Sequence, residues 1–393
     1  KLMLTNNIKF KNFSEKSNNL HINKIFKNLK INYLKGQIKF LLSFSKNYQY
    51  SYSKKLVHKY KNFFNFRVIG MGGSILGAKA IFQFLNHKIK KNFFFIDNLQ
   101  NRLDSKKNKK SFVNLVISKS GNTLETISNA NILIKKNNKN IFIIENKNNY
   151  LNNLASQIKA EIVEHKNYIG GRYSILSEVG MLPAELMGLK EKEFKGLNYL
   201  ISNKSFINQL IQNVASTLSL VNKGKYLSVI LNYDHKSENL LKWYQQLLAE
   251  SLGKKSKGIL PIISTMPKDN HSLMQFYLDG PKKNFYTFFS SAEKNSNQIN
   301  KKLLLKSHSY LSNKNIKKII YSQMLATQNI FKRKKIPYRS FEILQRNEKT
   351  LGEIFCFFIL ETILLGRALK VNPFDQPSVE LIKKETKKIL LRN

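Results

Sequence analysis

The chain has 393 residues, of which 42% are hydrophobic and 11% aromatic, so a packed core is available and global disorder is disfavoured. Its 67 Lys and Arg residues outnumber 24 Asp and Glu residues, which gives a formal net charge of +43. The single cysteine, Cys356, excludes an intramolecular disulfide and a multi-cysteine zinc site, and its apolar surroundings indicate a buried, inert thiol in a reducing cytoplasm.

The positive charge is spread along the chain rather than gathered in one motif. The excess is lysine, which accompanies Asn, Ile and Phe throughout, whereas arginine, the usual choice for bidentate contacts to bases, is scarce. We therefore favour a proteome-wide compositional drift, as in an AT-rich genome, over a specific nucleic-acid site. Salt separates the two readings, because adventitious attraction to lysine is screened at moderate ionic strength whereas specific binding survives.

No segment predicts a membrane anchor or a secretory signal. The most apolar stretch, 354–365, is shorter than the roughly 20 residues needed to cross a bilayer, and it contains Glu361. Residues 1–4 have no sustained apolar core and no small-residue cleavage site. We expect a cytoplasmic protein with no membrane partner.

The first part of the chain predicts helices and then an α/β domain. Residues 1–60 are rich in Lys and Asn with scattered apolar residues, and we interpret them as an N-terminal helical segment. Over 61–204, helical runs alternate with short apolar strands at 66–69, 93–96, 112–118, 141–145 and 161–164. This alternation is typical of βαβ units and a parallel sheet, so 61–204 is predicted as a first domain.

The alternation restarts at residue 205 and predicts a second domain over 205–370. The predicted strands are 226–231, 258–264, 285–290 and 338–344; helix 205–221 precedes them, and helices 238–251, 272–278 and 314–333 lie between them. Two more helices, 351–369 and 379–391, follow, the last of them in a C-terminal helical segment over 371–393. The predicted fold class is α/β, with two parallel-sheet sandwich domains and a C-terminal helical segment.

Two strand-to-helix turns carry residues suited to a phosphate. The run Gly70 to Ser74 lets the backbone approach an anion at a helix start, although a tight turn alone explains it equally well. Ser118, Ser120 and Thr123 place three hydroxyls on the second turn, beside the free N–H groups of a helix start. Three hydroxyls in one turn favour a phosphate monoester over a single helix-capping hydroxyl.

Other polar residues have an ordinary explanation when each is taken alone. Gln246 and Glu250 lie four residues apart on one face of a predicted helix, as in a solvated polar stripe. His271 opens a helix, and a lone histidine in such a place usually has no catalytic role. Lys383 lies on a lysine-rich, solvated helix face. Arg172 stands among small residues after a strand, which suits an anion clamp or a plain turn.

Together, these segments resemble the phosphoglucose isomerase family, which is built from two sugar-isomerase (SIS) domains of the flavodoxin-like type. The resemblance covers about residues 60–390, and its motifs stand in the family's order. One departure is Met71, where the family usually has Ile. The matching stretches are 68–77, 118–126, 170–177, 243–254, 267–280 and 372–383.

The resemblance implies an activity and four catalytic residues. The family interconverts glucose 6-phosphate and fructose 6-phosphate, in glycolysis and gluconeogenesis, by ring opening and proton transfer through a cis-enediol. By this resemblance Glu250 is the base that moves the proton and His271 the acid/base that opens the ring. Arg172 is implied as a cation near the enediolate and Lys383 as a C-terminal catalytic lysine.

The resemblance also implies substrate contacts and a partner. Gln246 matches a substrate-contacting position, and no metal or redox cofactor is required because the proton returns to the same sugar. The family is homodimeric, and His271 would reach the active site of the neighbouring subunit. The residues implied at the phosphate are Ser118, Lys119, Ser120 and Thr123, with Gly73 and Ser74 adjacent.

A related reading is another SIS-domain phosphosugar isomerase, or a phosphosugar-binding regulator. Such proteins share loops of the 118–123 type. They do not usually carry the 249–251 and 269–272 stretches together, which favours the first reading.

Overall fold

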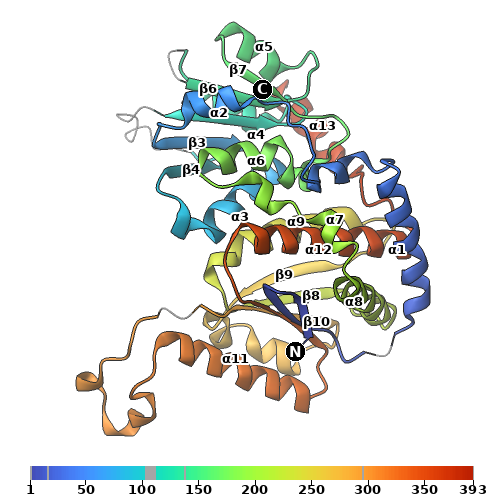
Figure 1. Cartoon of the computed structure of the whole chain (residues 1–393), viewed down its shortest axis with the longest axis vertical. Helices are drawn as coiled ribbons and strands as arrows, with labels where there is room; N and C mark the ends of the chain where they lie inside the picture. Colours follow the sequence, from blue (N-terminus) through green and yellow to red (C-terminus); the bar gives the residue numbers. More distant parts are fainter. Residues whose placement is uncertain (1, 16, 102–111, 137–138, 294–295, 393) are drawn as a thin grey trace.

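The structure is a computed structural model that describes all residues except 1, 16, 102–111, 137–138, 294–295 and 393. Two β-sheets lie one above the other in Figure 1, with helices between them and on their outer faces. The outermost residues of the predicted terminal segments, Lys1 and Asn393, fall outside the described residues.

The first sheet is fully parallel and has the strand order β4-β3-β5-β6-β7. This is the flavodoxin-like order 2-1-3-4-5, so the predicted topology of this sheet is confirmed. Every residue of the central strand β5 is buried, as expected for a sheet covered on both faces. The strands are β3 (Asn65–Gly70), β4 (Asn92–Ile96), β5 (Val113–Ser118), β6 (Lys139–Ile144) and β7 (Glu161–Glu164), and the helices are α3 (Leu76–Phe84), α4 (Leu124–Leu133), α5 (Tyr150–Gln157) and α6 (Glu178–Leu186).

The second sheet contains a parallel part in the order β11-β10-β8-β9. Its predicted strands are all present, so the α/β fold class is confirmed for both halves. The strands are β8 (Leu227–Asn232), β9 (Leu260–Thr265), β10 (Asn284–Ser291) and β11 (Tyr338–Ile343). The helices are α7 (Leu197–Leu200), α8 (Lys204–Asn222), α9 (Glu238–Leu252), α10 (Met274–Asp279), α11 (Ile316–Arg333) and α12 (Glu348–Ala368).

The N-terminal prediction is wrong for the first residues. Strands β1 (Leu2–Thr5) and β2 (Ile8–Lys11) form a hairpin, and β2 pairs antiparallel with β11 at the edge of the second sheet. Ile8 and Phe10 are fully buried there, because their alternation with lysines places them on the core face. Predicted helices follow within the segment, namely α1 (Asn19–Leu34) and α2 (Lys54–Tyr60).

Helices α9 and α12 lie between the two sheets in Figure 1 and belong to a core that spans both. Tyr244 of α9 stacks on Phe358 of α12 with ring centroids 3.9 Å apart. Helix α11 covers the outer face of the second sheet, where Met324 and Phe331 are buried. The fold therefore fixes α9 from both sides.

A buried polar network locks α9 to the second sheet. Arg339 of β11 pairs with Glu361 of α12, and each side chain is only 1% exposed. Arg339 also donates to Tyr244 of α9 at 3.1 Å and to Asn213 of α8 at 2.7 Å, while the Tyr244 hydroxyl donates to Glu361 at 2.8 Å. Because every charge has a partner, the network orients four elements at once.

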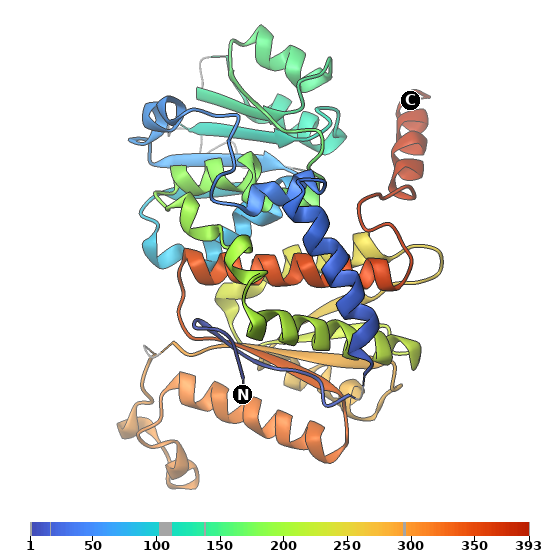
Figure 2. The same cartoon turned by 45° about the vertical axis from the view of Figure 1, so that its right-hand side comes forward.

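The last helix, α13 (Val379–Leu390), has no buried residue and stands clear of the body in Figure 2. Within the described part of the chain, none of the helices combines the length and apolar character needed to cross a membrane.

We expect Glu361→Ala to lower the free energy of unfolding by about 3–5 kcal/mol, because it leaves the Arg339 cation buried without its anion. Urea denaturation measures this change. The control Glu385→Ala removes an exposed carboxylate of α13 and should change stability by less than about 0.5 kcal/mol. Equal stability of the Glu361 variant and the native chain would contradict the role of the network.

Candidate active site

Two short helical turns meet where the chain leaves the first sheet. The turn η2 (Gly72–Ser74) follows β3, and the turn η5 (Gly171–Leu176) carries Arg172. A Cβ atom on Gly73 would lie 2.3 Å from the carbonyl carbon of Gly171, so only glycine lets the two backbones touch. A Cβ atom on Gly72, which adopts φ +51°, would lie 2.8 Å from Nε2 of Gln246, so glycine here lets η2 pack against α9.

Glu250 occupies the centre of this meeting point. Its Oε1 lies 3.3 Å from Nη1 of Arg172, and its Oε2 accepts a hydrogen bond of 3.0 Å from Nε2 of Gln246, one turn earlier on α9. The Glu250 side chain is 27% exposed, whereas that of Arg172 is 2% exposed. The structure therefore brings Glu250, Gln246 and Arg172 together, with the carboxylate open to a small molecule and the cation behind it.

Gln246 retains an unused acceptor at this site. Its Oε1 is buried and has no hydrogen-bond partner among the described residues. A buried carbonyl oxygen without a partner is costly, so a donor supplied by a ligand, such as a sugar hydroxyl, would satisfy it.

The Arg172 guanidinium is held by residues from two further segments. Its Nε donates to the Ser251 hydroxyl at 2.8 Å, and its Nη1 donates to Oε1 of Gln376 at 2.9 Å. Its Nη2 donates to the carbonyls of Pro373 at 2.7 Å and Asp375 at 3.1 Å. These bonds fix the plane of the cation beside Glu250.

Gln376 is a site residue that the sequence prediction missed. It lies in the 372–383 stretch that resembles the family, yet no role was assigned to it. Its contact with Arg172 spans 204 residues of sequence, which no local pattern reveals.

The hydroxyl-rich turn after β5 is not an ordinary helix cap. Thr123 precedes α4, but its side chain makes no capping hydrogen bond; its Oγ1 lies 3.0 Å from Oγ of Ser118 instead. The side chain of Ser120 accepts a bond of 3.3 Å from the Asn122 amide. The turn therefore places hydroxyls beside the uncapped N–H groups at the start of α4, an arrangement suited to a phosphate.

Helix α5 braces this turn from outside. The Leu151 amide donates to the Gly121 carbonyl at 3.0 Å, and the Tyr150 amide donates to Oδ1 of Asn122 at 3.0 Å. Gly121 adopts φ +64°, and a Cβ there would collide with Asn149 at 1.8 Å. The turn is thus rigid before any ligand arrives.

Lys119 points away from the hydroxyls of its own turn. Its ammonium donates to the Asn167 carbonyl at 2.7 Å and lies 3.6 Å from Glu145. Burial lowers the pKa of Lys119 below the ordinary value of a lysine. The structure thus places Lys119 behind the turn rather than on its ligand side.

The structure does not bring His271 and Lys383 to Glu250 within one chain. His271 ends the exposed turn η8 (Lys268–His271), and its imidazole has no hydrogen-bond partner among the described residues. Lys383 of α13 is 66% exposed and pairs with Glu380 at 2.6 Å. Their roles stay predictions from the resemblance.

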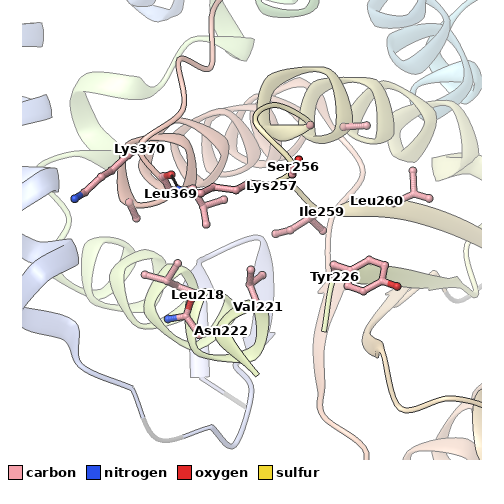
Figure 3. Close-up of a pocket in the computed structure, with 14 residues that line it drawn as sticks. Leu218, Val221, Asn222, Tyr226, Ser256, Lys257, Ile259, Leu260, Leu369 and Lys370 are labelled. Atoms are coloured by element: carbon pink, nitrogen blue, oxygen red, sulfur yellow. Dashed lines mark hydrogen bonds between the residues drawn. The ribbon is translucent and has the colours of Figure 1, made fainter. Parts of the chain in front are cut away.

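A cavity of about 800 Å³ lies elsewhere, behind the end of α9 (Figure 3). Leu218 and Val221 of α8, Leu369 and Lys370 after α12, and the loop before β9 line it. It contains neither the carboxylate of Glu250 nor the hydroxyl-rich turn, so volume alone does not identify the site. Among the described residues no group of three or more His, Cys, Asp or Glu side chains could hold a metal ion.

Comparisons with known proteins point to one family. The family model "Phosphoglucose isomerase" matches residues 43–265. Similar relatives are a probable glucose-6-phosphate isomerase of Methanococcus maripaludis, 31% identical over 96% of this chain and 90% of the relative, and a glucose-6-phosphate isomerase of Mycoplasmopsis pulmonis, 33% identical over 82% of each.

Solved structures share the fold. A hypothetical protein of Thermus thermophilus superposes with a TM-score of 0.80 at 21% identity, over 94% of both chains. A glucose-6-phosphate isomerase of Chlamydia trachomatis superposes with a TM-score of 0.68 at 18% identity, over 86% of this chain and 71% of that one. From the family match and the identity to these relatives, the chain belongs to the phosphoglucose isomerase family.

Proposed function

We propose that this chain is an aldose–ketose isomerase that interconverts glucose 6-phosphate and fructose 6-phosphate. The observation that carries the proposal is the Glu250 carboxylate, held by Gln246 and Arg172 and open to a ligand, in a chain of this family. Relatives named glucose-6-phosphate isomerase support the choice of substrate.

The proposed reaction needs one base that serves two neighbouring carbons. Glu250 takes the proton from carbon 2 of the open aldose and gives it to carbon 1 of the cis-enediol, while the hydroxyl proton on the carbon 2 oxygen passes to the carbon 1 oxygen, so no proton or electron is lost. The half-open carboxylate suits this exchange, because it can reach a substrate without losing its bond from Gln246. No external oxidant, reductant or metal enters this balance.

Arg172 supports the charge that develops on the substrate oxygens. Its Nη1 lies between Glu250 and Gln376, behind the carboxylate, so the positive charge would act on the substrate oxygens through its electrostatic field. Because it is buried and already oriented, this cation needs little reorganisation when an enediolate forms.

The phosphate is assigned to the turn after β5. Ser118, Ser120 and Thr123 supply hydroxyls and the start of α4 supplies amides, while Gly73 and Ser74 lie on the neighbouring turn η2. Lys119 would attract the phosphate only through its electrostatic field, because its ammonium donates to the Asn167 carbonyl instead.

Ring opening is assigned to His271 of a second copy of this chain, with Lys383 as a further catalytic group. The exposed, unpartnered imidazole supports this assignment, because among the described residues nothing competes for it and it is available to a neighbouring subunit. The imidazole would protonate the ring oxygen and take the proton from the hydroxyl on carbon 1. The active form is accordingly a homodimer, which we place in the cytoplasm, in glycolysis and gluconeogenesis.

A coupled assay tests the proposal directly. Purified protein is given fructose 6-phosphate, and glucose 6-phosphate is detected by its dehydrogenase through NADPH formation. Parallel assays with other ketose and aminosugar phosphates test the alternatives, namely another SIS-domain isomerase or a phosphosugar-binding regulator. Binding of sugar phosphate without turnover would favour the regulator and overturn the proposal.

We expect Glu250→Gln to bind fructose 6-phosphate almost normally but to lose at least about 10³-fold in turnover, because the amide cannot take a proton. The matched control is Glu238→Gln on the same helix, which removes an exposed carboxylate paired with Lys242 and should leave turnover unchanged. A Glu250 variant with a tenth of the native activity would remove this residue from the role of base.

We expect Ser118→Ala with Thr123→Ala to raise the KM for fructose 6-phosphate by about tenfold or more, because each hydroxyl contact contributes about 0.5–1.5 kcal/mol and more to a charged group. Turnover should fall less than affinity. Ser128→Ala on the outer face of α4 is the control, since that hydroxyl bonds the Leu124 carbonyl of its own helix. A loss of stability with unchanged KM would make the turn purely structural.

Mixing two inactive variants tests the shared site. His271→Ala and Glu250→Gln chains, each inactive alone, should regain activity when refolded together, because one site of each mixed dimer then has both native residues. Native mass spectrometry verifies that mixed dimers form. If they form and remain inactive, His271 does not act across a subunit interface.

A further inference from the structure

The turn formed by residues 372–376 supplies most of the acceptors that hold Arg172. Pro373, Asp375 and Gln376 each accept a bond from its guanidinium. The Tyr173 hydroxyl also donates to the Pro373 carbonyl at 2.9 Å. Displacement of this turn would therefore turn the cation that faces Glu250.

The turn is a preformed unit rather than a loose connection. The Asn372 side-chain Nδ2 donates to Oδ2 of Asp375 at 3.0 Å, and the backbone N–H of Phe374 donates to Oδ1 of Asn372 at 3.0 Å. The Phe374 ring packs 5.4 Å from Phe40 and 5.6 Å from Tyr173, measured between centroids. Such a unit moves as one body, so a single attachment can set its position.

Lys254, two residues after the end of α9, provides such an attachment. Its ammonium has three N–H groups, and three acceptors lie around it. These are the Ser251 carbonyl at 3.1 Å, the Asn372 carbonyl, and Oδ1 of Asp375 at 2.9 Å. The first acceptor belongs to the last turn of α9, one residue after Glu250. Only 12% of the Lys254 side chain is exposed, so water competes weakly for these bonds.

The ionisation of Asp375 favours the contact. The hydrogen bond from Lys254 lowers the pKa of Asp375 below its ordinary value, so the carboxylate stays ionised at neutral and mildly acidic pH. The link therefore persists over the range in which the chemistry would run.

Beyond the turn, the chain has little to hold it. No residue of α13 is buried, and its described ion pairs and side-chain hydrogen bonds stay within the helix. The place from which α13, and with it Lys383, leaves the body is therefore set at residues 372–376 (Figure 2).

We propose that Lys254 is a positioning residue for the isomerisation: it ties the end of α9 to the 372–376 turn and so fixes Arg172 and Gln376 relative to Glu250. This proposal rests on the proposed function for its kinetic part. It assigns Lys254 no contact with the substrate. The phosphate turn after β5 lies on other elements, so the loss of Lys254 should disturb the reacting end of the site and spare phosphate binding.

The kinetic test compares Lys254→Met with the native chain. The thioether keeps the side-chain bulk but has no donor, and we expect kcat for fructose 6-phosphate to fall about tenfold to a hundredfold with KM changed less than about threefold, as for a small misplacement of reacting groups. Lys254→Arg retains a cationic donor and should recover most of the loss. The control Lys255→Met removes the same charge at the next, exposed residue and should behave as the native chain.

Hydrogen exchange provides a readout that needs no activity. In the substrate-free protein, peptides covering 372–376 should exchange faster in Lys254→Met, while peptides of α12 should be unchanged. If Lys254→Met does not fold, Asp375→Asn, at a half-exposed side chain, tests the same link and should shift both readouts in the same direction. Combined with Lys254→Met, it should lower kcat by less than the product of the two separate losses, since the two residues share one contact.

The outcomes separate the two proposals. A native chain that does not turn over fructose 6-phosphate overturns the proposed function, and exchange at 372–376 then still decides whether Lys254 holds the turn. Unchanged kcat in Lys254→Met, or a loss that Lys254→Arg does not recover, overturns the positioning role. Unchanged exchange at 372–376 overturns the link itself.

Discussion

Arg172 is almost fully withdrawn from water, and a cation in that position persists only when its donors find acceptors. Those acceptors come from α9, through Ser251, and from the turn at 372–376. A segment of the first half, a helix of the second half and the C-terminal turn are therefore bound to one another. None of these three segments can shift without leaving a charged group or a carbonyl oxygen without its partner. The position of Glu250, which pairs with Arg172, depends on this arrangement.

The site divides its tasks between the two halves of the molecule. The first sheet ends in turns with glycines, hydroxyls and free amides, which suit the fixed charge of a phosphate. Helix α9 carries the carboxylate and the amide that would work on the carbon chain. The close approach of Gly72 to the Gln246 side chain brings turn η2 of the first half against α9 of the second half.

The sequence predicts what short stretches determine and misses what distant contacts determine. The buried strand β5 and the hydroxyls after it are adjacent in sequence, so strand and site could be predicted together. The partner strand of β2 lies more than 300 residues away in the sequence, so the edge hairpin could not be predicted. The direction of Lys119 depends on Asn167 and Glu145, which come from other parts of the chain, and only the structure reveals it.

The edge hairpin also has a consequence for biosynthesis. Strand β2 leaves the ribosome long before β11, with which it pairs through Phe10 and Phe341. The first sheet can close as soon as its own residues have emerged, because all its strands lie within one continuous segment. The second sheet cannot bury Ile8 and Phe10 until synthesis has passed residue 343. The nascent chain must therefore carry the apolar face of this hairpin without β11 while the intervening residues are synthesised, the period in which a chaperone that shields exposed strands would matter most.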